Sequence, residues 1–236
     1  MKILAIDASA KSASACVCEI DGARERILSS QYINCGLTHS QTLLPMIDGC
    51  LKSSGLSLDD MDIAAVTHGP GSFTGIRIGI ATVQGLVMGT DLKAVGVSTL
   101  EAIAMGGRAY STPVICAVMD ARQRQVYNAL FRFSEGKPMR ITEDRAISLD
   151  DLNSELSAYE EVLFIGDGAE LTYAGSEHCG KLLACEPLLY QTAFHAARIA
   201  CDLAADGAQI PPLRPDYLRP VHISERKNQT PTTELR

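Results

Sequence analysis

The sequence predicts an α/β protein made of two similar halves, each with the order strand, strand, strand, helix, strand, helix. Short apolar runs typical of buried strands alternate with segments whose apolar residues recur at helical spacing. Asp7 and Asp120 each end the first apolar run of their half, and "THGPG" (67–71) and "IGDG" (165–168) each follow a strand that comes after a half's first helix. We interpret these correspondences as an internal duplication of a βββαβα unit.

In the first half, a strong turn signal at Asp21-Gly22 separates the second and third predicted strands. The first helix has apolar residues at positions 43, 44, 47 and 51, and Gly55 is its expected stop. Because proline fits best in a helix's first turn, Pro45 places the start of this helix near Thr42. The predicted strands are 2–9, 12–20, 24–33, 62–71 and 93–98, and the predicted helices are 39–55, 75–90 and 99–107.

The second half repeats this order, and a turn signal at Glu135-Gly136 separates its second and third strands. Its predicted strands are 113–121, 125–133, 139–147 and 162–170, its predicted helices are 148–159 and 193–207, and 170–192 is read as a loop with a short strand. After residue 210 the chain is Pro-rich and then polar without periodicity. We therefore expect an N-terminal subdomain (1–108), a C-terminal subdomain (109–210) and an extended, partly disordered tail (211–236).

Composition excludes several classes of protein. The 236 residues carry a net charge of -7, so the chain alone is poorly suited to gripping nucleic-acid phosphates or an anionic membrane surface. No apolar run approaches the roughly 18 residues that a membrane-spanning helix needs. The eight cysteines include no CxxC pair and lie mostly in apolar runs, which favours buried free thiols. We expect a cytoplasmic protein with reduced cysteines.

The stretch "THGPGSFTGIRIG" (67–79) resembles a phosphate-binding loop in composition but lacks the residues that such loops need. A Walker loop requires lysine after its last glycine, and Ile76 follows Gly75. A dinucleotide fingerprint would require glycine at Thr74. A generic anion site remains open, formed by free N–H groups at the helix start with a Ser72 or Thr74 cap. The alternative is a tight strand-to-helix turn.

The two helices of the first half carry more apolar surface than one face of a sheet requires. Two glycine pairs with a spacing of four, Gly75/Gly79 and Gly85/Gly89, together with the small Ala81 and Thr82, suggest a small-residue side of the second helix that approaches a neighbour closely. This surface predicts either core packing or contact with a partner, and the sequence leaves both open. The residues concerned are Leu43, Leu44, Ile47, Leu51, Gly75, Ile76, Gly79, Ile80 and Val83.

No catalytic arrangement and no metal site can be assembled from the spacing of reactive residues. His39 would need a second ligand four residues later, where Leu43 stands. Asp7 and Asp120 could face a cleft between the halves and hold a hydrated Mg²⁺, or they could cap turns. We therefore predict no catalytic residue and no metal.

Four strings together carry a resemblance to a known family. They are "MKILAIDAS" at the start, "HSQTLLP" at 39–45, "THGPGSFTGIRIGIATVQGLVMG" at 67–89 and "GVSTLEAIA" at 96–104. They resemble the TsaB (YeaZ) family, the bacterial partners of the TsaD-type threonylcarbamoyltransferase in making the t6A modification of tRNA. The resemblance covers about the first 130 residues well and the rest weakly, with "RPDYLRP" (214–220) similar to the family's tail. It implies the ASKHA fold (actin/sugar-kinase, RNase H-like) of two duplicated halves.

The resemblance also implies an ATPase-like scaffold with a decayed active site. Catalytic relatives bind metal through an HxxxH pair, of which this chain keeps His39 but has Leu43 at the second position. The phosphate hairpin "DASAKSAS" (7–14) has no glycine, and "IGDGAE" (165–170) is a remnant of an adenosine-binding motif. Weak ATP or ADP binding stays open in a cleft with Asp7, Gly71, Ser72, Asp120, Gly166 and Gly168. No cofactor is expected.

The function implied is that of a non-catalytic partner subunit in the t6A complex. The family pairs with TsaD through its first two helices, here about 39–54 and 75–90, and pairs with itself through the same face. A TsaE-type ATPase joins near the cleft, and tRNA is contacted only indirectly. Two alternatives are a glycoprotease-like metal hydrolase, an older label for the family, and an ATP/ADP-binding sensor.

Overall fold

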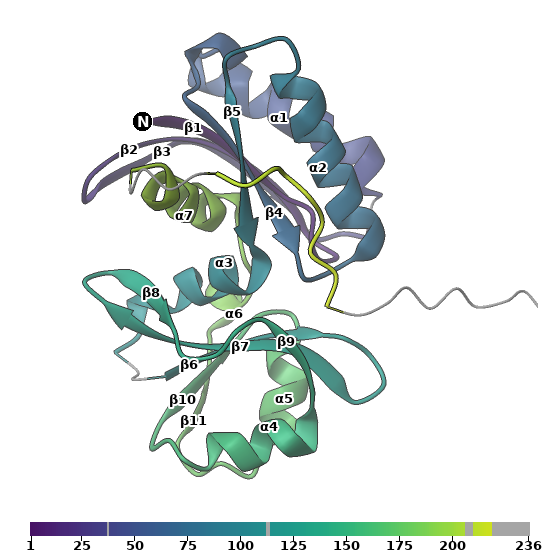
Figure 1. The fold of residues 1–236 in the computed structure, drawn as a ribbon, viewed down its shortest axis with the longest axis vertical. Coiled ribbons are helices and arrows are strands. Elements are labelled where there is room, and N and C mark those ends of the chain that lie inside the picture. Colours follow the sequence, from purple (N-terminus) through teal and green to yellow (C-terminus); the bar gives the residue numbers. More distant parts are fainter. Residues whose placement is uncertain (37, 112–113, 206–209, 219–236) are drawn as a thin grey trace, which may run out of the picture.

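The computed structural model describes residues 1–36, 38–111, 114–205 and 210–218, which form two mixed sheets, one above the other in Figure 1. The first sheet has the order β3-β2-β1-β4-β5. Its strands are β1 (Lys2–Asp7), β2 (Ala13–Asp21), β3 (Arg24–Ile33), β4 (Ile63–Gly69) and β5 (Lys93–Ser98). β1 pairs antiparallel with β2 and parallel with β4, and both β1 and β4 are apolar and almost wholly buried because helices cover both faces of the sheet.

Three helices cover the first sheet. On one face α1 (His39–Ser54) packs on β2 and β3, and α2 (Phe73–Val87) packs on β4 and β5. On the opposite face lies α7 (Ala193–Ala205), against β1, β2 and β4. The short 3₁₀ helix η1 (Leu58–Asp60) connects α1 to β4.

The second sheet has the order β11-β10-β6-β7-β8, and β9 also pairs with β7. Its strands are β6 (Val114–Asp120), β7 (Gln125–Ser134), β8 (Lys137–Arg140), β9 (Arg145–Ser148), β10 (Val162–Ile165) and β11 (Lys181–Leu183). The remaining helices are α3 (Thr99–Gly106), η2 (Gly107–Ala109), α4 (Leu149–Leu156), α5 (Ala169–Gly175) and α6 (Glu186–Leu189). Two mixed sheets with covering helices confirm the predicted α/β fold class.

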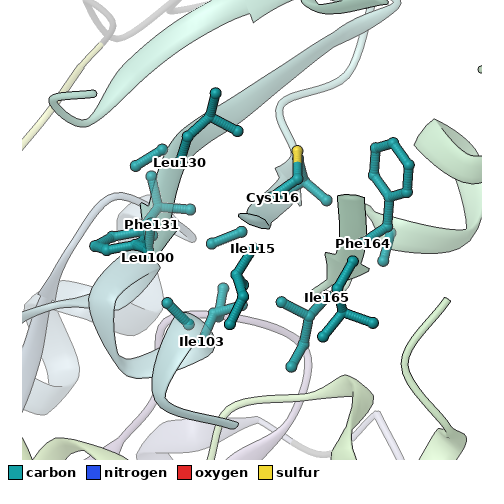
Figure 2. Close-up of a cluster of buried hydrophobic side chains, with 14 of the residues drawn as sticks. Leu100, Ile103, Ile115, Cys116, Leu130, Phe131, Phe164 and Ile165 are labelled. Carbon is teal, nitrogen blue, oxygen red and sulfur yellow. The ribbon is translucent and has the colours of Figure 1, made fainter. Parts of the chain in front are cut away.

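The core of the second half includes a helix that belongs by sequence to the first. Leu100 and Ile103 of α3 pack with Ile115, Phe131 and Ile165 of the second sheet (Figure 2). In the other direction, α7 follows the second sheet in sequence but packs on the first. The division at residue 108 stays a proposal, and α7, which that division assigns to the C-terminal subdomain, supplies part of the first sheet's core.

Several predicted boundaries differ from the structure. α1 begins at His39, not near Thr42, so Pro45 lies in its second turn. The missing proline N–H would have bonded the Gln41 carbonyl, and because Gln41 and Pro45 are both exposed, water can satisfy that carbonyl.

The predicted strand 139–147 is two strands, β8 and β9, which pair with opposite ends of β7. Between them the amides of Ile141 and Thr142 both bond the Leu130 carbonyl, while the Thr142 hydroxyl accepts from the Leu130 amide, so the ladder is interrupted. The segment 170–192, read as a loop with one strand, contains most of α5, then β11 and α6.

The tail is described as far as residue 218, and the predicted disorder of 224–236 lies outside the described residues. Residues 210–218 run beside β5 and α2, drawn in yellow in Figure 1. Within the described ranges, no helix combines the length and apolar character needed to cross a bilayer.

Candidate functional site

The glycine-rich stretch forms a strand-to-helix turn between β4 and α2. Ser72 caps α2, since its hydroxyl accepts the Gly75 amide at 3.2 Å, and its own amide donates to the Ser9 carbonyl at 2.7 Å. Gly71 has φ 151°, and a Cβ there would lie 2.3 Å from the Ser9 carbonyl oxygen. Only glycine therefore allows this turn to pack against the β1–β2 hairpin.

Gly75 and Gly79 bring α2 close to the sheet beneath it. A Cβ at Gly75 would lie 2.0 Å from the Ala8 carbonyl oxygen, and one at Gly79 would lie 3.2 Å from a Val66 methyl group. We had predicted both glycines as partner-interface residues, but both are buried and serve packing within the chain. Gly85, predicted on the same side, is exposed with open space around it, because ten residues at 100° each rotate it well away from Gly75.

Most of the apolar residues predicted to meet a partner lie in the core of the first half. Five of them are buried beneath α1 and α2, and their assignment as interface residues is corrected for that reason: Leu43, Ile47, Ile76, Ile80 and Val83. Leu51 is half-buried against the same core. Leu44 alone remains on the surface, with 55% of its area exposed.

The exposed surface of these two helices is nevertheless largely uncharged. Beside Leu44 it presents Arg77, Ala81, Gly85 and Met88, the last 81% exposed. We call these five residues the α1–α2 face. Of these five residues, only Leu44 was predicted to lie at an interface. Hydropathy shows that a helix is apolar on several sides, but it does not show which side the sheet covers.

A cavity of about 840 Å³ opens between the two halves, beside the first turns of α1 and α2. The first half contributes the β1–β2 hairpin, with Lys11 and Ser12, and the starts of α1 and α2. Across the cavity lie Asp120, Arg122 and Asp167 of the second half. Of the six residues predicted for a nucleotide cleft, three line this cavity: Gly71, Ser72 and Asp120.

Asp7 does not line the cavity and is fully buried behind it. Its Oδ1 accepts hydrogen bonds from the Ser9 amide at 3.3 Å, the Ser9 hydroxyl at 2.6 Å and the Thr67 hydroxyl at 2.5 Å. Its Oδ2 has no partner among the described residues. Burial raises the pKa of this carboxyl, against the opposing effect of its hydrogen bonds. Asp7 therefore ties β1 to β4 and is not presented to a ligand.

Gly166 and Gly168 let the turn after β10 lie against β6. A Cβ at Gly166 would lie 2.1 Å from the Val118 carbonyl oxygen, and one at Gly168 would lie 2.8 Å from the Asp120 amide nitrogen. The residue between them, Asp167, was missed by sequence reasoning although it does line the cavity. Its Oδ1 accepts the Asp120 amide at 3.2 Å, and burial, together with the charges of Asp120 and Asp7, raises its pKa to about 6.

His39 lies at the cavity wall with one ring nitrogen committed to the fold, because Nε2 is 2.8 Å from the Ala10 carbonyl oxygen. Leu43, one turn later, is buried in the core. Within the described residues, no group of three or more His, Cys, Asp or Glu side chains is placed to hold a metal ion.

Comparison with known proteins places this geometry in a family. The family described as "TsaD: tRNA N6-adenosine threonylcarbamoyltransferase" matches residues 34–206. The protein named tRNA threonylcarbamoyladenosine biosynthesis protein TsaB from Escherichia coli (strain K12) is 33% identical over 226 residues, covering 93% of this chain and 95% of its own. The TsaB of Bacillus subtilis (strain 168) is 30% identical over 226 residues, covering 93% of this chain and 94% of its own.

A solved structure shares the fold. YeaZ from Pseudomonas aeruginosa superimposes with a TM-score of 0.78 at 24% identity, over 92% of this chain and 99% of that one. The near-complete coverage in both directions means that both sheets and their helices have counterparts in the relative. By sequence and by fold, the chain belongs to the TsaB (YeaZ) family of tRNA threonylcarbamoyladenosine biosynthesis proteins, relatives of TsaD.

Proposed function

We propose that this protein is a non-catalytic subunit of the t6A-forming complex and that it binds a TsaD-type transferase through the α1–α2 face. The observation that carries the proposal is the exposed apolar surface of that face, with Leu44 and Met88 as its largest members. Exposed apolar side chains that gather on one surface are typical of interaction sites. Family membership supports the choice of partner, because the related proteins carry names from t6A biosynthesis.

The α1–α2 face combines small exposed residues with larger exposed apolar ones. Ala81 and Gly85 are small exposed residues along α2, while Leu44 on α1 and Met88, directly after α2, are larger exposed apolar residues. Small residues between larger apolar ones allow helices of two proteins to approach closely while the flanking side chains interdigitate. A second copy of the chain would use the same face, so self-association would compete with transferase binding.

The other partners follow from the same proposal. A TsaE-type ATPase would join the pair near the cavity between the halves, and the chain would act in the cytoplasm. The chain itself, with its net charge of -7, would leave tRNA contact to the transferase. Its contribution to catalysis would be to stabilise the active conformation of that partner.

An omission assay tests the function. A TsaD-type transferase, a TsaE-type ATPase, threonylcarbamoyl-AMP synthase, threonine, bicarbonate, ATP and unmodified tRNA are combined with and without this protein. Nucleoside mass spectrometry measures t6A, which we expect only when the chain is present. Unchanged t6A without it would contradict the proposal.

A pair of variants tests the face. Leu44→Glu places a charge on the α1–α2 face, and Met139→Glu makes the matched change on β8 of the second sheet, where Met139 is also 55% exposed. We expect Leu44→Glu to abolish both the complex and t6A formation, and Met139→Glu to leave both unchanged. A stable complex with Leu44→Glu would place the interface elsewhere. Ile80→Glu is unsuitable as a test because Ile80 lies in the core.

A second candidate function is nucleotide sensing in the cavity, favoured by its volume of about 840 Å³ and by Lys11, Arg122 and Ser72 in its walls. Calorimetry with ATP or ADP, each with Mg²⁺, tests it. Micromolar binding that is lost in Lys11→Met would support it. Binding retained in Lys11→Met, or no heat at millimolar nucleotide, would remove it.

A further inference from the structure

A stack of three side chains extends the α1–α2 face at the N-terminal end of α2. The Arg77 guanidinium lies 4.6 Å from the centre of the Phe73 ring. The Tyr217 ring lies 5.0 Å from the Phe73 ring, tilted by 33°. All three residues are exposed. A cation and two aromatic rings in this arrangement attract one another through the ring quadrupoles.

This stack exists because the segment 210–218 docks on the first half. The side chain of Leu213 packs into the first half's core over Gly96, where a Cβ would lie 2.9 Å from it. Gln84 of α2 donates to the Leu213 carbonyl at 3.3 Å. Further along, the Asp216 amide donates to the His68 carbonyl at 2.8 Å. These contacts fix the backbone on either side of Arg214 and thereby place the Tyr217 ring against the Phe73 ring.

The stack and the α1–α2 face form one continuous stripe. Phe73, Arg77, Ala81 and Gly85 follow one another along α2 at spacings of four residues, which places them on one side of the helix, and Met88 follows directly after its last residue. Arg77 has no ion pair with any described residue, so its charge meets only the Phe73 ring and solvent. Tyrosine and arginine are the residues most enriched at the energetic centres of interfaces.

We infer that the Arg77–Phe73–Tyr217 stack is an anchor of the partner-binding face, which receives an acidic side chain of the transferase, and that segment 210–218 is a structural part of that face. The inference rests on the proposed function. A carboxylate that approaches Arg77 would form a charge-assisted bond while its aliphatic stem covers the exposed Tyr217 ring. The guanidinium is already oriented by Phe73, so little side-chain entropy is lost on binding.

The test measures the affinity of full-length variants for a TsaD-type transferase by calorimetric titration, with thermal unfolding of each variant as a check on folding. Arg77→Gln and Tyr217→Ala are each expected to weaken binding by about tenfold or more. Leu213→Asp, which undocks the segment without changing any residue of α2, should weaken binding to a similar degree. Arg26→Gln and Tyr32→Ala on β3 are the matched controls, since Tyr32 is 43% and Tyr217 40% exposed.

The contribution of charge is separable from that of packing. Binding of the unmodified chain should weaken as salt rises from 50 to 500 mM, and Arg77→Gln should flatten that dependence. Wild-type affinity in Arg77→Gln and Tyr217→Ala, with Leu44→Glu still unable to bind, would overturn the inference and leave the proposed function intact. Failure of the unmodified chain to bind the transferase would overturn both.

Discussion

At the scale of single residues, two carboxyl groups near the cavity differ in whether they are buried behind it or line it. Asp7 was predicted at a ligand site because it ends a strand, yet it is fully buried and its hydrogen-bonded oxygen joins β1 to β4. Asp167, which lies inside the "IGDG" motif but was not predicted as a site residue, is held at the cavity by two glycines that pack against β6. Whether a carboxylate faces the cavity or is buried behind it depends on how the backbone around it packs in three dimensions. The sequence alone does not show this packing.

Asp167 should make stability depend on pH. Its pKa is raised to about 6 in the folded chain, so between pH 4 and 6 the folded state holds a proton that the unfolded state has released, and stability falls as pH rises through this window. Asp167→Asn should remove this dependence and raise the free energy of unfolding at pH 7.5 by up to about 3 kcal/mol. Urea titrations at pH 4.5 and 7.5 measure it, with the exposed Glu170→Gln as control. An Asn variant no more stable at pH 7.5 would contradict the raised pKa.

Two glycines of α2 should respond oppositely to the same substitution. In Gly75→Ala the new Cβ meets the Ala8 carbonyl oxygen, so we expect a loss of about 1–3 kcal/mol or more. In Gly85→Ala the Cβ enters open space, and the helix gains up to about 1 kcal/mol from alanine's higher propensity. Thermal unfolding of the two variants compares them directly. Equal effects would mean that α2 does not lie on the sheet as described.

At the scale of elements, the order of strands and helices was predictable, because apolar periodicity and turn residues are local signals. Three features were not. β8 and β9 separate through long-range bonds to Leu130, α5 and α6 are too short for a periodic signal, and the side of α2 that faces the sheet depends on packing. The predicted partner residues failed for this last reason, since the most apolar stripe of an amphipathic helix is the stripe that the chain buries itself.

The orientation of α2 predicts a contrast between two isoleucines. Ile80 lies on the buried side of α2, so Ile80→Ala should cost about 2–4 kcal/mol of unfolding free energy. Ile27 on β3 is half exposed, and Ile27→Ala should cost less than about 1 kcal/mol. Denaturant titration gives both values. A small loss at Ile80 would indicate that α2 presents this side to solvent.

At the scale of the whole molecule, the two halves share their helices. α3 places Leu100 and Ile103 in the second core, and α7 covers the first sheet with Phe194, Ile199 and their neighbours. The duplication was visible in sequence as repeated strand ends and turns. The exchange of α3 and α7 between the halves was not visible in sequence, because helices with the same apolar pattern can cover either sheet.

Shared helices predict that neither half is independent. A fragment of residues 1–108 lacks α7, so one apolar face of its sheet is bare, and we expect it to aggregate or to show no cooperative unfolding. Addition of a peptide spanning 190–218 should restore a folded complex, detectable by circular dichroism and size-exclusion chromatography. A fragment that folds cooperatively alone would contradict the role given to α7.

The crossing of α7 onto β1 also sets the order of events while the protein is being made. β1 leaves the ribosome first, but the helix that covers one side of its sheet comes from residues 193–205, near the far end of the chain. At synthesis rates of roughly 5–20 residues per second, the first sheet waits for on the order of ten seconds before α7 is made. During that interval one side of the sheet, formed by residues such as Ile3, Ala5 and Val95, has no helix over it, and such an apolar surface is prone to aggregation. The apolar side of the first sheet is therefore covered only after the last helix, α7, has been synthesised.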